Sequence, residues 1–111
     1  MNKATVPAIL LLGSILGISS AEAALVQHFD KTISVLEAAD SPCIFFQLTG
    51  VTEANPAVPS GVWFGIDKNQ GNAKEMYALL LSARLSGTSL ARVLTNGDVV
   101  CGVAKAFTLD L

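Results

Sequence analysis

The residues that could carry covalent chemistry are few in this chain of 111 residues, which has one histidine, His28, and two cysteines, Cys43 and Cys101. A nucleophilic enzyme needs a general base beside its nucleophile and a third group that orients the base. His28 is far in sequence from any serine motif, and the sequence has no G-x-S-x-G, H-E-x-x-H or phosphate-loop pattern. We therefore predict that the protein is not an enzyme and that His28 lies at the surface or at a sheet edge.

Acid–base and metal sites have equally little support in the sequence. Asp67, Glu75 and Asp98 could meet in space, but acidic residues are numerous enough for chance proximity. A zinc site is not expected, because the chain has only one histidine and no C-x-x-C spacing. We expect no metal and no cofactor.

The N-terminus predicts export. Residues 1–23 contain Lys3, the apolar block Val6–Ile18 and the small-x-small pattern that ends at Ala23, which is typical of a signal peptide cleaved after that residue. The alternative is a membrane anchor, but an apolar block of about 13 residues is short against the roughly 20 that span a bilayer. We therefore predict one domain, residues 24–111, in a secreted or periplasmic protein.

The two cysteines are expected to form a disulfide, because an exported protein meets an oxidising environment. An even pair in an exported chain is first interpreted as a disulfide. A Cys43–Cys101 bond would close a loop with 57 intervening residues, which the chain-entropy model values at about 4 kcal/mol. Removal of residues 1–23 leaves 88 residues, and a chain of that size buries only about 60–65% of its unfolded surface. A disulfide or a partner is therefore expected to support the core.

The charge of the mature chain argues against nucleic acid as a partner. Without Lys3 and Glu22 the chain has six basic and eight acidic residues, so its formal net charge stays at −2. The basic residues are spread from Lys31 to Lys105 without a cluster, whereas phosphate binding needs one. The mature chain also contains no further apolar stretch long enough to predict a membrane span.

One helix is expected in residues 72–87, with signals at both ends. Asn72 can cap the first turn, Glu75 can return a bond to the Asn72 backbone, and Gly87 suits the left-handed residue that ends a helix. At about 100° per residue, one apolar face should pack against the domain. Its members are Met76, Leu79, Leu80 and Ala83.

A second apolar stripe lies on the opposite face of this helix and consists of Tyr77, Leu81 and Leu85. Three aligned apolar residues on a domain too small to cover them suggest a buried partner surface. We therefore predict that this stripe is the interface of a homo-oligomer.

Strands are expected on both sides of the helix. Gly and Pro clusters bound them, and Asp30–Lys31 indicates a bend within the first. Asn96–Gly97 predicts a two-residue hairpin, and the prolines of Thr52–Ser60 predict a surface loop. The expected strands are Leu25–Glu37, Cys43–Val51, Gly61–Asp67, Ser89–Thr95 and Asp98–Leu111.

This order predicts a mainly β fold with one helix, the five-stranded OB-fold barrel with its helix between the third and fourth strands. A small β-sandwich is the alternative.

Four runs of sequence carry a resemblance to a known family. They are CIFFQLTGV, GVWFGI, KEMYALLLSARLSG and the C-terminal VCGVAKAFTLDL. Together they cover most of the mature chain and resemble the small exported proteins described as subtilase cytotoxin B-subunit-like. The resemblance implies an OB-fold and a ring-shaped pentamer that binds glycans on host cells, with a catalytic A-type subunit as a further partner. No motif here matches the sialoglycan pocket of that toxin, so the glycan-binding residues stay unknown.

Two functions are therefore expected as alternatives. The first is an exported module that binds a glycan or glycoconjugate as a homo-oligomer, and the second is a structural or regulatory domain that docks on another protein without binding sugar. Trp63, Phe46 and Tyr77 are the aromatic side chains that could stack on a sugar ring. Core packing is the favoured prediction for Trp63 and Phe46, because both lie inside apolar strands.

Overall fold

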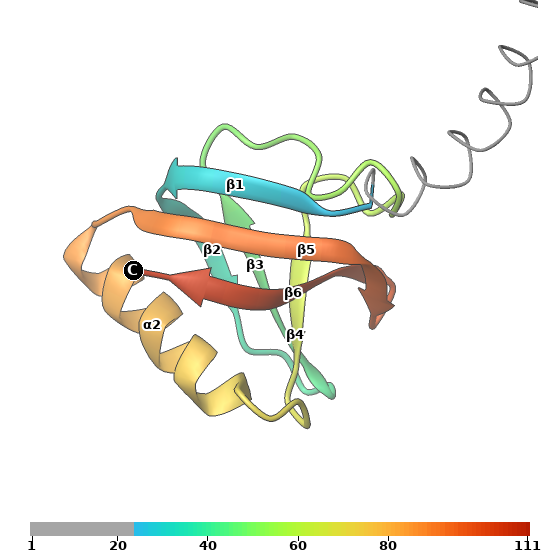
Figure 1. Cartoon of the computed structure of the whole chain (residues 1–111). Coiled ribbons are helices and arrows are strands. Elements are labelled where there is room, and N and C mark those ends of the chain that lie inside the picture. Colours follow the sequence, from blue (N-terminus) through green and yellow to red (C-terminus); the bar gives the residue numbers. More distant parts are fainter. Residues whose placement is uncertain (1–23) are drawn as a thin grey trace, which may run out of the picture.

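The computed structural model describes residues 24–111 as one six-stranded sheet with one helix (Figure 1). The predicted signal peptide, residues 1–23, lies outside the described part of the chain. The mainly β class with one helix is confirmed. The elements are β1 Val26–Lys31, β2 Ile33–Glu37, β3 Cys43–Leu48, β4 Phe64–Asp67, α2 Ala73–Ser86, β5 Leu90–Val100 and β6 Val103–Asp110.

The sheet consists of two antiparallel halves of three strands. Its strand order is β1-β5-β6-β4-β3-β2, and every neighbouring pair is antiparallel except β4 and β6. The parallel β4–β6 pair therefore joins the half β1-β5-β6 to the half β2-β3-β4. Figure 1 shows the two halves crossing each other, with α2 at one end.

The prediction of a five-stranded OB-fold barrel is wrong in its strand count, because the structure has six strands in one open sheet. The expected first strand is divided at Thr32 into β1 and β2, after Asp30 turns the backbone to a positive φ of 56°. Because of this bend, β1 pairs with β5 while β2 pairs with β3. The sheet is therefore open, with β1 and β2 as its edges, and α2 follows the fourth strand rather than the third.

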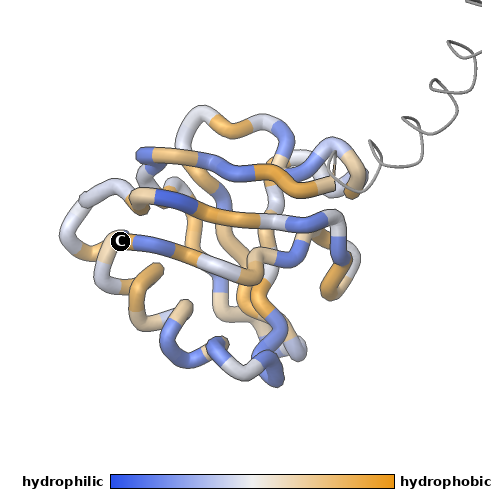
Figure 2. Tube along the Cα trace, in the orientation of Figure 1, coloured by the Kyte–Doolittle hydropathy of each residue, from blue (hydrophilic) through white to orange (hydrophobic). Residues whose placement is uncertain are grey.

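The core lies between the inner face of the sheet and one face of α2. Figure 2 shows hydrophobic residues in the strands, mixed with hydrophilic ones, and the burial of β6 alternates from Val103 to Ala106, as expected when one face is buried. Phe46 of β3 and Phe64 of β4 stack with ring centroids 4.9 Å apart, and neither is exposed. Full burial of each such side chain is worth roughly 1.5–3 kcal/mol. Other fully buried side chains include Ile66, Leu80, Leu90 and Val93.

The helix α2 confirms the expected boundaries but not the expected N-cap. Gly87 adopts the left-handed conformation and its N–H bonds to the Ala83 carbonyl. The Asn72 side chain makes no cap bond, because it donates to the Phe107 carbonyl of β6 and accepts from Gln70. No helix in residues 24–111 is long and apolar enough to cross a membrane. Of the predicted core face, Met76, Leu80 and Ala83 are buried and Leu79 is half-buried.

The hairpin predicted at Asn96–Gly97 is wrong, because β5 continues through both residues. The strand bulges there, and Gly97 has φ 90° where it packs against Ala24. The actual turn is Cys101–Gly102, between β5 and β6, and both residues have positive φ. Positive φ at two central residues is what a type I′ hairpin requires.

The segment predicted as a surface loop, Thr52–Ser60, is a loop between β3 and β4 that is exposed at five positions, but Ala54, Asn55 and Val58 are buried. Its Asn55 is fully buried and donates to the Thr95 hydroxyl at 2.9 Å and to the Ala24 carbonyl at 2.7 Å. His28 of β1 lies half-buried against the same segment, donating from Nε2 to the Ala54 carbonyl at 2.8 Å. The prolines explain why this segment stays outside the sheet. Asn55 can be buried because its side chain has hydrogen-bond partners for both its amide N–H groups and its oxygen.

The predicted disulfide is present in the structure. Cys43, the first residue of β3, is fully buried and bonds to Cys101 at the β5–β6 turn, with Cα atoms 6.4 Å apart. The two residues are separated by 58 positions. The bond therefore ties the end of one half of the sheet to the other half.

Replacing Cys101 by serine should lower the free energy of unfolding by about 2–5 kcal/mol, because the unfolded chain regains the entropy that the bond removes. Urea denaturation of residues 24–111 would measure the loss. Cys43→Ser places a hydroxyl in a buried site, so the exposed Cys101 is the cleaner position. An unchanged unfolding midpoint for Cys101→Ser would contradict a stabilising role for the bond.

Candidate functional site

A groove on the outer face of the sheet is the first candidate site. It is lined by Glu37 of β2, Phe45 of β3, Trp63 just before β4, and Val103 of β6, and its volume is about 220 Å³. We call it the outer groove. These side chains point outward because Phe46, Phe64 and Ala104, their neighbours along the chain, point into the core.

Gly65 makes room for this arrangement. It lies on β4 beside Phe45, and a Cβ built on it would stand 2.7 Å from Cγ2 of Val103 and 3.1 Å from Cγ1 of Val100. Both valines belong to the hairpin whose turn holds Cys101. The absence of a side chain at Gly65 therefore lets the disulfide-linked hairpin lie directly on β4 and form one wall of the groove.

The chemistry of the outer groove is that of an apolar platform with one polar group. Phe45 and Trp63 meet edge to face, with ring centroids 6.2 Å apart, and both are half-buried. Glu37 is exposed and lies directly opposite Phe45 in the β2–β3 pair. An ionised carboxylate accepts hydrogen bonds only, and aromatic walls with a few polar groups are typical of small-ligand sites. The groove can therefore pack a ring and accept hydrogen bonds at its rim.

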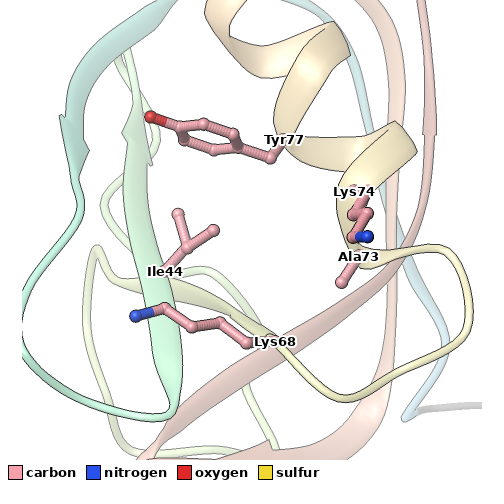
Figure 3. A pocket seen from close by; sticks show the side chains of 5 residues that line it. All are labelled: Ile44, Lys68, Ala73, Lys74 and Tyr77. Carbon is pink, nitrogen blue, oxygen red and sulfur yellow. The ribbon is translucent and has the colours of Figure 1, made fainter.

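A second hollow lies between α2 and β3. It is also about 220 Å³ in volume and is lined by Ile44, Lys68, Ala73, Lys74 and Tyr77. We call it the helix cleft. Figure 3 shows the Tyr77 side chain extending from α2 toward β3, above Ile44, while Lys74 lies beside α2. Lys68 donates to the Ala39 carbonyl at 3.3 Å. The cleft therefore carries positive charge, unlike the outer groove.

The stripe predicted as an oligomer interface is divided by the structure. Tyr77 is half-buried against the core, while Leu81 and Leu85 are exposed by 38% and 79%. Arg84, beside the stripe, donates to the Ile33 carbonyl at 3.4 Å. The two leucines alone thus present a free apolar surface on α2.

The remaining candidates from the sequence form no reactive cluster. In residues 24–111 no three His, Cys, Asp or Glu side chains gather to hold a metal, so Asp67, Glu75 and Asp98 do not form such a group. His28 lies on β1, an edge strand of the sheet, which is one of its two predicted positions. It is half-buried and packs edge-on against Phe64, with ring centroids 5.3 Å apart. Its Nε2 donates to the Ala54 carbonyl, so the side chain helps to hold the Thr52–Ser60 segment in place.

Sequence reasoning missed most of the outer groove. The prediction of core packing holds for Phe46 but is wrong for Trp63, which lies just before β4, is half-buried and lines the outer groove. The alternation within CIFFQL, where Phe46 is buried, carried a usable signal, since it places Phe45 outward. Glu37 and Val103 could not be found this way, because they reach the groove only through strand pairing and the hairpin.

Comparisons with known proteins support the fold. No protein-family model matches the sequence, and no curated protein is significantly similar to it. The structure is similar to the crystal structure of a cholera toxin-like B-subunit from Citrobacter freundii, with a TM-score of 0.56 and 10% sequence identity. The match covers 79% of this chain and 86% of that one. The chain therefore has a toxin B-subunit-like fold.

Gly65→Ala should destabilise the domain by about 1–3 kcal/mol, the usual effect of overpacking, because its methyl group would press on Val103 and Val100. Urea denaturation would measure the loss. Gly71→Ala is the matched control, since a Cβ there meets nothing within 4 Å and the backbone needs no positive φ. Equal stability of the two variants would show that the hairpin does not lie on Gly65.

Proposed function

We propose that the protein is an exported binding module of the subtilase cytotoxin B-subunit-like kind, which engages a glycan or glycoconjugate as a homo-oligomer and is not an enzyme. The toxin B-subunit-like fold and the disulfide support this proposal. The bond also suits a secreted or periplasmic location, where disulfides persist.

The outer groove is the observation that carries the proposal. It combines the partly exposed Trp63 and Phe45 with an exposed carboxylate, Glu37, in one hollow. A sugar ring has an apolar face of C–H groups and a rim of hydroxyl donors, so it matches both parts of the groove. The groove is shallow and small, so a single contact of this kind is weak.

Association would turn such weak contacts into useful binding. Linked sites raise the overall affinity by mass action without any new contact. Leu81 and Leu85 provide an exposed apolar surface on α2 through which copies could pack. A ring of copies, as the resemblance implies, would present several outer grooves to one surface.

A second function rests on the same two leucines. An exposed apolar helix face also suits docking on a different protein, such as a catalytic A-type subunit or another periplasmic partner. In that case the leucines would bind a partner while the groove binds no sugar. A glycan array on residues 24–111 separates the two functions.

Trp63→Ala should weaken binding to any glycan found on the array by about tenfold or more, which corresponds to a loss of about 1.4 kcal/mol. The reason is that the indole is the largest apolar wall of the outer groove. Trp63→Phe keeps an aromatic ring and should retain part of the binding. Lys68→Gln, in the helix cleft, is the control that should leave it unchanged, provided the glycan is neutral. Full binding by a folded Trp63→Ala variant would remove the groove from the proposal.

Leu81→Glu combined with Leu85→Glu should leave a folded, disulfide-bonded domain but dissociate the oligomer, because it places two charges in the apolar contact. Light scattering at micromolar concentration would give the mass. Ser82→Glu with Ser86→Glu is the matched control, since it adds the same charges at the same spacing on exposed positions about 100° around the helix from the two leucines. A monomeric wild type, or a double variant that keeps the wild-type mass, would defeat the interface.

A further inference from the structure

The outer groove has a charge of one sign only. Of its four lining residues, Glu37 is the only one that ionises, and the other three carry no charge. The one salt bridge in residues 24–111 joins Arg92 to Asp110 at 2.8 Å, so no described cation neutralises Glu37 through an ion pair. Any ligand in the groove therefore meets an uncompensated carboxylate.

No basic residue on the neighbouring strand β6 lines the outer groove and offsets the charge of Glu37. Lys105 lies on the same outer face of β6 as Val103, two residues further on, and is in register with Gly65. It does not line the groove. Lys68 and Lys74 line the helix cleft instead. The molecule thus has one hollow with a carboxylate and another with two ammonium groups.

We infer that the outer groove takes neutral saccharides and excludes acidic ones, with Glu37 as the residue that sets this specificity. The inference rests on the proposed glycan-binding function. Hydroxyl groups of a neutral sugar donate to the Glu37 carboxylate while the ring packs on Trp63 and Phe45. A saccharide with a carboxylate or sulfate near that rim meets a like charge and offers no donor there.

Two physical properties make the inference specific. Repulsion between exposed charges is screened by salt, because the Debye length falls from about 30 Å at 0.01 M to about 10 Å at 0.1 M ionic strength. Discrimination against acidic saccharides must therefore shrink as salt is added. Glutamine has nearly the shape of glutamate and keeps one acceptor oxygen, so Glu37→Gln removes the charge with little change in packing.

Trp63 gives a readout of the groove itself, because it is the only tryptophan in the chain. The experiment takes the neutral glycan bound best on the array and its counterpart carrying a terminal carboxylate or sulfate. Each is titrated into residues 24–111 while the indole fluorescence is recorded. The wild type should bind the neutral glycan at least about tenfold more tightly at low ionic strength, and added salt should narrow the difference.

Variants then test whether Glu37 causes the difference in affinity between the neutral and the acidic glycan. Glu37→Gln should bring the two affinities closer together, by weakening the neutral glycan and strengthening the acidic one. Lys105→Gln is the control for a general change in surface charge and should not narrow the difference. Trp63→Ala has no indole to report binding, so calorimetry is used for that variant. Acidic glycan binding that Trp63→Ala leaves intact and that Lys68→Gln with Lys74→Gln removes would support the inference, since it places the acidic ligand in the helix cleft.

The inference and the proposed function fail in different ways. An acidic glycan that binds as tightly as its neutral counterpart and changes the Trp63 signal would overturn the specificity while keeping the groove as a sugar site. An unchanged ratio of affinities in Glu37→Gln would do the same. If no glycan of either class binds, or none depends on Trp63, the proposed sugar site itself fails.

Discussion

The bend in the first strand is the constraint on which the rest of the molecule depends. Thr32 alone separates β1 from β2, although these strands are the opposite edges of the sheet. Thr49 holds this junction, because its backbone N–H donates to the Thr32 carbonyl at 2.9 Å and its hydroxyl accepts from the Thr32 hydroxyl at 2.8 Å. A sheet whose first and last strands are joined by one residue must curl. The curl gives the domain an inner face for its core and an outer face for its groove.

The two faces divide the aromatic residues between stability and recognition. Phe46 and Phe64 stack inside the curl, where they are inaccessible to a ligand. Phe45 and Trp63 precede them in the chain by one residue each and therefore stand on the opposite face. The core can thus stay fixed while the groove varies, because a change at Phe45 or Trp63 does not alter the inner stack.

The sequence predicts the helix, the bend and the cysteine pair of this protein, but it does not predict the position of the turn or the packing that depends on the whole fold. The helix α2 follows from its own period and from Gly87, and the bend follows from Asp30–Lys31, since both signals act within a few residues. The predicted turn is misplaced because Asn96–Gly97 is a strong hairpin signal, whereas the observed turn begins with Cys101, which type I′ turns do not favour. The prolines of Thr52–Ser60 show that this segment leaves the sheet but not that Asn55 is buried. The groove could not be derived, because its walls come from three strands and the residue before β4, and their register depends on the whole fold.

The topology also has a consequence for how the chain folds. The β2–β3 and β5–β6 hairpins pair neighbouring segments, but the β4–β6 and β1–β5 pairs join segments that are far apart in sequence. Folding slows as contacts become less local, because loop closure precedes the gain from pairing. The disulfide spans 58 positions and links the same two halves that the short parallel pair must bring together. A chain oxidised while still unfolded therefore begins its search with those halves already tethered, so that oxidation before strand pairing shortens the slowest part of the search.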